Sequence, residues 1–364
     1  MKRQYLIVSF CVALLCLVSC QEKPEEQPDD GGGHAYKSEF VWDDPVDIFG
    51  FQPEARYAYC PSAIEMPDGS CHVFFCGNPQ AGKMVDNVYH LFVKADGGMT
   101  EAVSVLQPTP GTWDSFHCCD PSVIEGDFRL DGKAYKYAMF YLGIDKGDCL
   151  GNEVGVAFSN DLNSTSWVKY PSQLIPFDGD RSRYWGVGQP SALSLDGKGK
   201  VLLTYTVGDG NGTRVVYNEL DMSDMSQLLV GERKTVPTGG SSIVFHNCDF
   251  AFDRDAGRIV ATIAGDWPSN YPSFIESFTA VASMDLDSFY DNSGSWKRLK
   301  DINYSVSGYN RNHNACLLRD SFGYVKDYKT PTVFFTISGT VPTAEWSYRI
   351  MRTDGRIIKV EVTD

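Results

Sequence analysis

The sequence lacks an excess of positive charge, an extended helical periodicity and the cysteine spacings of zinc-binding motifs. Its 32 Lys and Arg residues against 47 Asp and Glu residues give a formal net charge of −15, which argues against nucleic acid or an anionic lipid surface as a partner. No CxxC or CxxC…HxxxH pattern occurs, so no zinc-finger framework is expected. Apolar residues almost nowhere recur at helical spacing. What the 364 residues do contain is 43% hydrophobic and 13% aromatic side chains, which is enough for a sizeable core.

Residues 1–20 are predicted to be a targeting segment rather than part of the fold. Lys2 and Arg3 precede an apolar run over residues 5–18, which is too short to span a bilayer comfortably. The run ends in LVSC, which resembles a bacterial lipobox. We therefore expect Cys20 to be the lipidated first residue of the mature protein, and the alternative is an ordinary secretory signal.

Residues 21–35 are predicted to be a disordered tether, because the stretch QEKPEEQPDDGGG has no apolar side chain to bury. An acidic run after a lipobox resembles the surface-export signals of Bacteroidetes lipoproteins. Together these features predict an exported protein that is lipid-anchored to the outer membrane through Cys20 alone, at the cell surface. Residues 36–364 are then expected to form a single domain.

Three of the 11 cysteines fall in residues 1–20, and the others belong to the body of the protein. Export would permit disulfides. However, Cys71, Cys76 and Cys149 lie in or beside hydrophobic strand patterns, so we predict that most of the cysteines are buried small hydrophobic side chains. The adjacent pair at 118–119 has no assignment from the sequence.

One short motif recurs through the chain and divides it into units. Residues 59–64, 119–124 and 188–193 read YCPSAI, CDPSVI and GQPSAL, and each is followed by a turn and an apolar strand pattern. Residues 246–251 and 313–318 are weaker copies in the same setting. The units begin at a tip residue, and the five tips are 60, 69, 58 and 67 residues apart: Cys60, Asp120, Gln189, Asn247 and Asn314. A period of this length indicates a repeat fold.

The repeat predicts an all-β fold, a five-bladed β-propeller with about four antiparallel strands per blade. Short β-type runs fill each unit, and turn signals such as DGNG at 209–212 separate them. A jelly roll or a β-sandwich also has many short strands, but neither is expected to begin every unit with the same motif.

In a propeller the innermost strand of each blade lines a central channel, so the residues that open these strands should meet at its mouth. Aromatic and polar side chains at and before these positions are suited to sugars, whose CH faces stack on rings and whose hydroxyls need fixed hydrogen-bond partners. The alternative is that the aromatic residues only fill the channel. The residues predicted to bind a substrate are Arg56, Tyr59, Cys60, Trp113, Asp114, His117, Arg183, Tyr184, Trp185, Gln189, His246, Arg311, His313 and Asn314.

The Asp-Pro pair at 120–121, the phrase GVAFSND at 155–161 with Trp167 after it, and RNHN at 311–314 resemble the five-bladed propeller glycosidases. These are glycoside hydrolase family 43 and its relatives, including families 32, 62, 117 and 130, and the likeness covers residues 51–352. The resemblance implies an oligo- or polysaccharide ligand, of plant or host origin, in the central funnel.

Glycoside hydrolysis normally needs two carboxyl groups. The resemblance to family 43 implies a base at Cys60, a modulating carboxylate at Asp120 and an acid at Gln189, so only the second position keeps its carboxyl group. We predict that Asp120 is catalytic and that Asp249, on the fourth inner strand, is its partner. The other candidate carboxyl groups are Asp114, Glu153, Asp266 and Glu276.

The family resemblance leaves several alternatives. In family 130 the Asp-Pro motif carries the acid and phosphate is the partner, which Arg56, Arg183, Arg311 and His313 would hold, although Ser122 replaces that family's arginine. In family 43 a histidine at the place of His313 sits on a calcium ion or water. No cofactor is otherwise required.

The sequence thus predicts a glycoside hydrolase-like enzyme whose catalytic residues differ from those of family 43. The protein is expected to be a monomer. A non-catalytic glycan-binding propeller on the same scaffold is the main alternative, because Cys60 and Gln189 cannot replace carboxyl groups. A sialidase-like enzyme is a third, since residues 159–167 resemble one Asp-box.

Overall fold

The computed structural model describes residues 36–50, 57–78, 85–239, 245–265, 275–339 and 348–362. Residues Ser38–Lys359 form one compact unit. The predicted leader with Cys20, the tether, Arg56 and Asp266 lie outside the described residues. Within the described ranges, no helix is long and apolar enough to cross a membrane.

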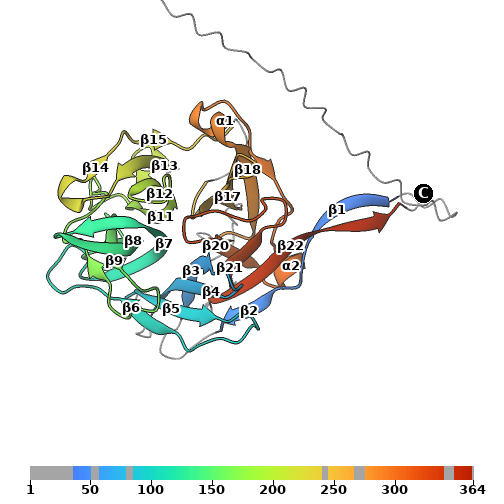
Figure 1. Cartoon of the computed structure of the whole chain (residues 1–364), viewed down its shortest axis with the longest axis horizontal. Coiled ribbons are helices and arrows are strands. Elements are labelled where there is room, and N and C mark those ends of the chain that lie inside the picture. The colour runs from blue at the N-terminus through green and yellow to red at the C-terminus, as the bar shows by residue number, and fades with distance from the viewer. Residues whose placement is uncertain are drawn as a thin grey trace, which may run out of the picture. The chain divides into compact units, whose positions relative to one another are not determined.

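The strands of Ser38–Lys359 follow one another as five antiparallel groups, which are the blades that the repeat predicts (Figure 1). The first two blades are β3 (Ala58–Glu65), β4 (Cys71–Gly77), β5 (Asn87–Val93) and β6 (Val103–Leu106), and then β7 (His117–Leu130), β8 (Lys133–Ile144), β9 (Glu153–Ser159) and β10 (Val168–Lys169). The third is β11 (Gly186–Ser194), β12 (Lys200–Asp209), β13 (Gly212–Asp221), β14 (Leu229–Val230) and β15 (Lys234–Thr235).

The fourth blade is β16 (Phe250–Asp253), β17 (Arg258–Ala264), β18 (Thr279–Asp285) and β19 (Lys297–Arg298). The fifth is β20 (Arg311–Arg319), β21 (Thr332–Ser338) and β22 (Arg349–Glu361), which pairs with β1 (Tyr36–Trp42) and β2 (Val46–Phe49) from the start of the chain. The short helices are η1 (Met225–Gln227), α1 (Leu286–Tyr290) and α2 (Tyr304–Ser307). The parallel pair β20–β3 joins the fifth blade to the first, with Leu318 opposite Ala63.

All five tip residues adopt the same unusual backbone conformation. Their φ angles are positive, at 50° for Cys60, 52° for Asp120, 53° for Gln189, 49° for Asn247 and 43° for Asn314. In four of the blades the pairing of the inner strand shifts across the tip, which is the signature of a β-bulge. A left-handed residue costs about 1–2 kcal/mol outside glycine, so the same kink in every blade confirms that the motif identifies equivalent positions.

A repeated hydrogen bond joins each inner strand to the next. In each case the side chain two residues after a tip accepts a hydrogen bond from the backbone N–H three residues after the next tip. The pairs are Ser62 with Val123 at 3.4 Å, Ser122 with Ala192 at 3.0 Å, Ser191 with Phe250 at 2.9 Å and Asp249 with Leu317 at 3.0 Å. In the fifth blade the Cys316 thiol hydrogen-bonds the backbone of Ala63. The serine of the Pro-Ser motif therefore has a structural role.

Arg319 lies among these side chains and is only 1% exposed. Its Nη1 donates to the carbonyl oxygen of Phe250 at 2.5 Å and lies 3.3 Å from Asp249 Oδ1, while its Nη2 donates to Ser122 Oγ at 2.9 Å. A buried arginine needs such partners, because burying an unpaired charge is costly. Nη1 of Arg319 also donates to Ser191 Oγ at 3.4 Å, so Arg319 links the second, third, fourth and fifth blades.

The hydrophobic core consists of clusters between successive blades. One cluster, which contains Phe74, joins the first blade to the second, and another, which contains Phe158, joins the second to the third. The cluster with Tyr217 joins the third blade to the fourth, and the cluster with Phe335 joins the fourth to the fifth. A further cluster that contains Phe334 joins the fifth to the first. Each blade thus buries both of its faces against neighbours, so the blades depend on one another for stability.

We expect Arg319→Leu to lower the free energy of unfolding by about 3–5 kcal/mol, because the substitution leaves Asp249 buried without its cation. Denaturant unfolding would measure the loss. Adding Asp249→Ser, which restores the serine of the first three blades, should recover part of it. The control is Arg254→Ala, since exposed Arg254 only covers the Tyr324 ring at 4.1 Å, with an expected change within about 0.5 kcal/mol. Equal stability of the two single variants would contradict the role of Arg319.

Candidate functional site

Two pairs of neighbouring tip residues are in contact, and Asp120 is the most buried of the five tips. Asp120 is 4% exposed, whereas Cys60, Gln189, Asn247 and Asn314 are partly exposed. The Cys60 thiol hydrogen-bonds with the Asp120 carboxyl group, and the Asn247 N–H donates to Gln189 Oε1 at 3.3 Å. The left-handed kink therefore occurs where the tip side chains of neighbouring blades contact one another, in the first and second blades and in the third and fourth.

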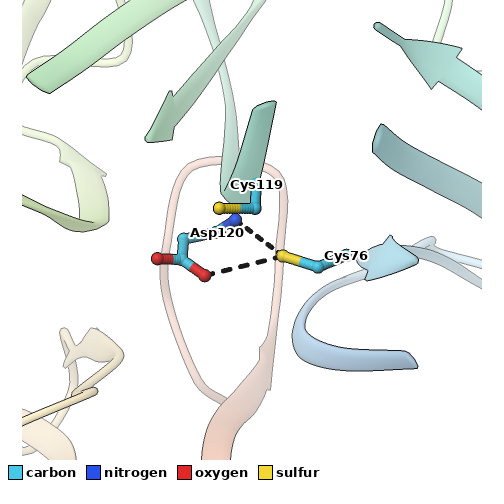
Figure 2. Close-up of side chains that lie close together, drawn as sticks. All are labelled: Cys76, Cys119 and Asp120. Carbon is cyan, nitrogen blue, oxygen red and sulfur yellow. Dashed lines mark hydrogen bonds between the residues drawn. The ribbon is translucent and has the colours of Figure 1, made fainter. Parts of the chain in front are cut away.

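Asp120 lies among thiols rather than beside a cation. Its backbone N–H donates to Cys76 Sγ at 2.7 Å, and the Cys76 thiol donates to Asp120 Oδ1 at 3.5 Å (Figure 2). Burial raises the pKa of Asp120 to about 6, with the nearby charge of Asp86 adding to the rise and the thiols of Cys60 and Cys76 opposing it. A carboxyl group in such surroundings holds its proton more readily than an exposed one, as a general acid requires.

Glu276 is a second buried carboxyl group, in the opposite kind of environment. It lies just before β18, is 1% exposed, and its Oε1 is 2.8 Å from Nδ1 of His246. Burial by itself would raise the pKa of Glu276, but the hydrogen bond and charge of His246, together with His313, hold it below its usual range. His246 also acts electrostatically on Asp120. Two carboxyl groups in contrasting environments, both influenced by one histidine, are the pairing expected of an acid and a base.

Asp249, the predicted partner of Asp120, forms hydrogen bonds and an ion pair with neighbouring blades. Its Oδ1 accepts from Ser191 Oγ at 2.7 Å and lies 3.3 Å from Arg319, and its Oδ2 accepts from the Leu317 N–H. A carboxylate with both oxygens engaged in this way is poorly placed to move a proton. We therefore assign Asp249 to the framework and favour Glu276 as the second carboxyl group.

The sequence reasoning missed Asp86, which is buried beside the site. It accepts hydrogen bonds from the hydroxyls of Tyr57 at 2.5 Å and Tyr59 at 2.8 Å, and its ligand atom lies within 4.8 Å of those of His117 and Cys119. Burial raises the pKa of Asp86. Asp86 precedes β5 and belongs to no repeated motif, so nothing in the sequence marked it. Its contact fixes Tyr59, one of the predicted substrate-binding residues.

Trp113 and Asp114 were predicted to bind substrate, but their contacts are internal to the second blade and its boundary with the first. Trp113 stacks on Tyr141 with 5.8 Å between ring centroids. Asp114 is 1% exposed and pairs with Lys169 Nζ at 2.6 Å; burial opposes ionisation, yet Lys169 and Thr112 hold its pKa below the usual range. Both residues therefore stabilise the fold.

Of the other aromatic candidates, Trp185 lies beside the site. It packs, with Tyr59 and Cys60, against the buried cluster of Cys76, Cys119 and Leu142. Tyr184 is partly exposed and carries the exposed Arg183 over its ring at 5.2 Å. Trp185 is thus the aromatic side chain best placed to meet a ligand near Asp120.

The fifth blade contributes a buried polar group. Arg311 and His313 are each 3% exposed, and His313 contacts Asn314 through Nδ1 and lies 3.5 Å from Ser338 Oγ through Nε2. Burial lowers the pKa of His313 although Glu276 opposes this. Within the described residues, the clusters of three ligand side chains involve other positions than His313, so the calcium site remains a prediction.

Comparison with known proteins places the fold. No protein-family model and no curated protein matches the sequence. Among solved structures, Zg3597, a family 117 glycoside hydrolase of Zobellia galactanivorans, is similar with a TM-score of 0.58 at 12% identity, over 87% of this chain and 90% of that one. The α-L-arabinofuranosidase PaAbf62A of Podospora anserina is similar with a TM-score of 0.54 at 12% identity, over 86% of this chain and 96% of that one. The catalytic domain of the Coprinopsis cinerea GH62 α-L-arabinofuranosidase is similar with a TM-score of 0.56 at 11% identity, over 87% of this chain and 97% of that one. The chain therefore has the five-bladed propeller fold of these glycoside hydrolases.

Proposed function

We propose that the protein is a glycoside hydrolase-like, carbohydrate-active protein in which Asp120 is the general acid and Glu276 the base. The observation that carries the proposal is the contrast between these two buried carboxyl groups around His246. Asp120 is surrounded by thiols, whereas Glu276 is paired with His246 at 2.8 Å. The fold shared with glycoside hydrolases supports a sugar as the ligand.

In this proposal the Asp120 carboxyl group gives its proton to the glycosidic oxygen as the bond to the leaving sugar breaks. The Glu276 carboxylate removes a proton from the water that attacks the other face of the sugar, which is the inverting mechanism. Trp185 offers an aromatic face beside Asp120. Cys60 and Gln189, which stand where family 43 would have carboxyl groups, take no part in proton transfer.

Glycan binding without hydrolysis is the second candidate. The observation that favours it is the contact of Asp120 with Cys60 and Cys76, since a carboxyl group held by thiols is less free to approach a leaving oxygen. In either case the oligo- or polysaccharide lies against the same tip residues.

We expect Asp120→Asn and Glu276→Gln each to reduce hydrolysis of aryl glycosides and oligosaccharides by about 10²–10⁴-fold, since each removes one proton-transfer group. Glycan affinity should change little. The control is Asp127→Asn, an exposed position on the same strand as Asp120, which should keep the wild-type rate. Full activity of Glu276→Gln would reject the base assignment. Binding by the wild type and Asp120→Asn alike, without turnover by either, would favour the binding protein.

His246 should position and tune Glu276, and its removal should change the pH profile. The charged groups that act on Glu276 are His246 and His313. Because the pKa of Glu276 is depressed, its carboxylate persists, and activity should hold, to pH values below the usual glutamate range. In His246→Gln burial remains and the partner is lost, so the acidic limb of kcat/KM against pH should move to higher pH. An unmoved acidic limb would contradict this role.

We also propose that the protein is a surface lipoprotein, with residues 21–35 as the tether between the lipid on Cys20 and the propeller. The order of charged end, apolar run and LVSC supports the proposal. Metabolic labelling with a radioactive fatty acid should mark the wild type in the membrane fraction, and Cys20→Ala should lose the label. A wild type that stays unlabelled would point to an ordinary secretory signal.

A further inference from the structure

Three thiols and one carboxyl group meet at the junction of the first and second blades. Cys76 is the penultimate residue of β4, and Cys119 and Asp120 are consecutive in β7. The ligand atoms of these three residues all lie within 4.8 Å of one another, and Figure 2 shows their side chains converging. Cys60, at the tip of β3, adds a thiol that hydrogen-bonds with both Cys76 and Asp120. Three donors therefore lie around one point, and the Cys60 thiol lies beside them.

The spacing of this cluster suits a tetrahedral metal ion. With Zn–S near 2.3 Å and Zn–O near 2.0–2.2 Å, a tetrahedral zinc places a sulfur and an oxygen ligand about 3.5 Å apart. The Cys76 Sγ to Asp120 Oδ1 distance is 3.5 Å. Cys76 pairs with Tyr59 across β3–β4, and Cys119 pairs with Leu142 across β7–β8. The donors thus stand on strands whose positions are set by hydrogen-bonded ladders, as a preorganised site requires.

The charge of the cluster also favours a cation. Cys76 and Cys119 are 0% and 3% exposed, and within the described ranges no lysine or arginine forms an ion pair with Asp120. A bound divalent cation stabilises thiolates and is itself stabilised by them.

We propose that Cys76, Cys119 and Asp120 form a three-ligand binding site for a thiophilic divalent cation such as Zn²⁺, with a water molecule completing the coordination. Sulfur donors with one carboxylate select zinc over calcium or magnesium, which prefer oxygen ligands alone. The site is separate from the calcium position expected at His313. Occupancy engages the Asp120 carboxylate, so the metal-bound protein could not use Asp120 as a general acid, and zinc would act as an inhibitor of the proposed hydrolysis.

Metal binding is tested on the full mature protein after reduction, with Co²⁺ or Zn²⁺ alone and no sugar. We expect one Co²⁺ per chain with the thiolate-to-cobalt absorption and the strong visible bands of a tetrahedral site, bleached by Zn²⁺, and release of protons on binding. Cys76→Ser and Cys119→Ser should each weaken binding at least tenfold. Asp120→Asn should weaken binding but keep the thiolate absorption. Cys149→Ser is the control, because this partly exposed cysteine lies outside the cluster, and should bind as the wild type does.

A second measurement needs no variant and so does not depend on whether the substituted proteins fold. Zn²⁺ should bind the reduced wild type at one ion per chain, measured by elemental analysis after gel filtration, and should raise its melting temperature because it binds the folded state. Reduced wild type that takes up no Co²⁺ or no Zn²⁺ would overturn the metal site. A disulfide between Cys76 and Cys119 in the protein before reduction would overturn it as well. Because both readouts are made without substrate, failure of the glycosidase proposal leaves them unaffected, and their failure leaves it standing.

Discussion

The hydrogen bond that passes from each inner strand to the next is the interaction on which the rest of the structure depends. A side chain two residues after the left-handed tip accepts a backbone N–H of the following blade, through Ser62, Ser122, Ser191 and Asp249 in turn. A short side chain with an acceptor atom is needed there, because the strands approach closely at the centre. The primary role of the Pro-Ser motif is therefore to connect neighbouring blades, and any role in a binding site is additional.

The fourth blade departs from this rule, and the departure has consequences. Asp249 brings a charge to a position where the first three blades have a neutral hydroxyl, and the buried guanidinium of Arg319 compensates for it at 3.3 Å. The same arginine donates to Ser122, Ser191 and the Phe250 carbonyl, so this one side chain connects four blades. A carboxylate that looked catalytic by its place in the repeat is committed to the framework, because its partners are buried with it.

Because the hydrogen bond between blades is made two residues after each tip, the tip residue itself can vary. Since the left-handed kink is the same in all five blades, each tip presents its side chain at the same level whatever its chemistry. The result is a site with two unlike sides. Thiols and Asp120 occupy the side of the first and second blades, and His246, Glu276 and His313 occupy the side of the fourth and fifth. Proton transfer to a sugar and metal binding both draw on Asp120, so the two proposals compete for one carboxyl group.

The sequence by itself determined the all-β class, the number of blades and the five equivalent tips, because a repeated backbone kink needs a repeated local motif. It also identified Asp120, the one carboxyl group among the Pro-Ser tips. It did not determine the roles of Asp249 and Arg319, or the gathering of Asp86, Cys76 and Glu276 around the tips. Asp86, Cys76 and Glu276 lie on second strands and loops outside the motif, and the partners of Asp249 and Arg319 are far away in the chain. Only the tertiary structure decided those roles, because the pairing of a buried charge depends on which distant side chains are buried with it.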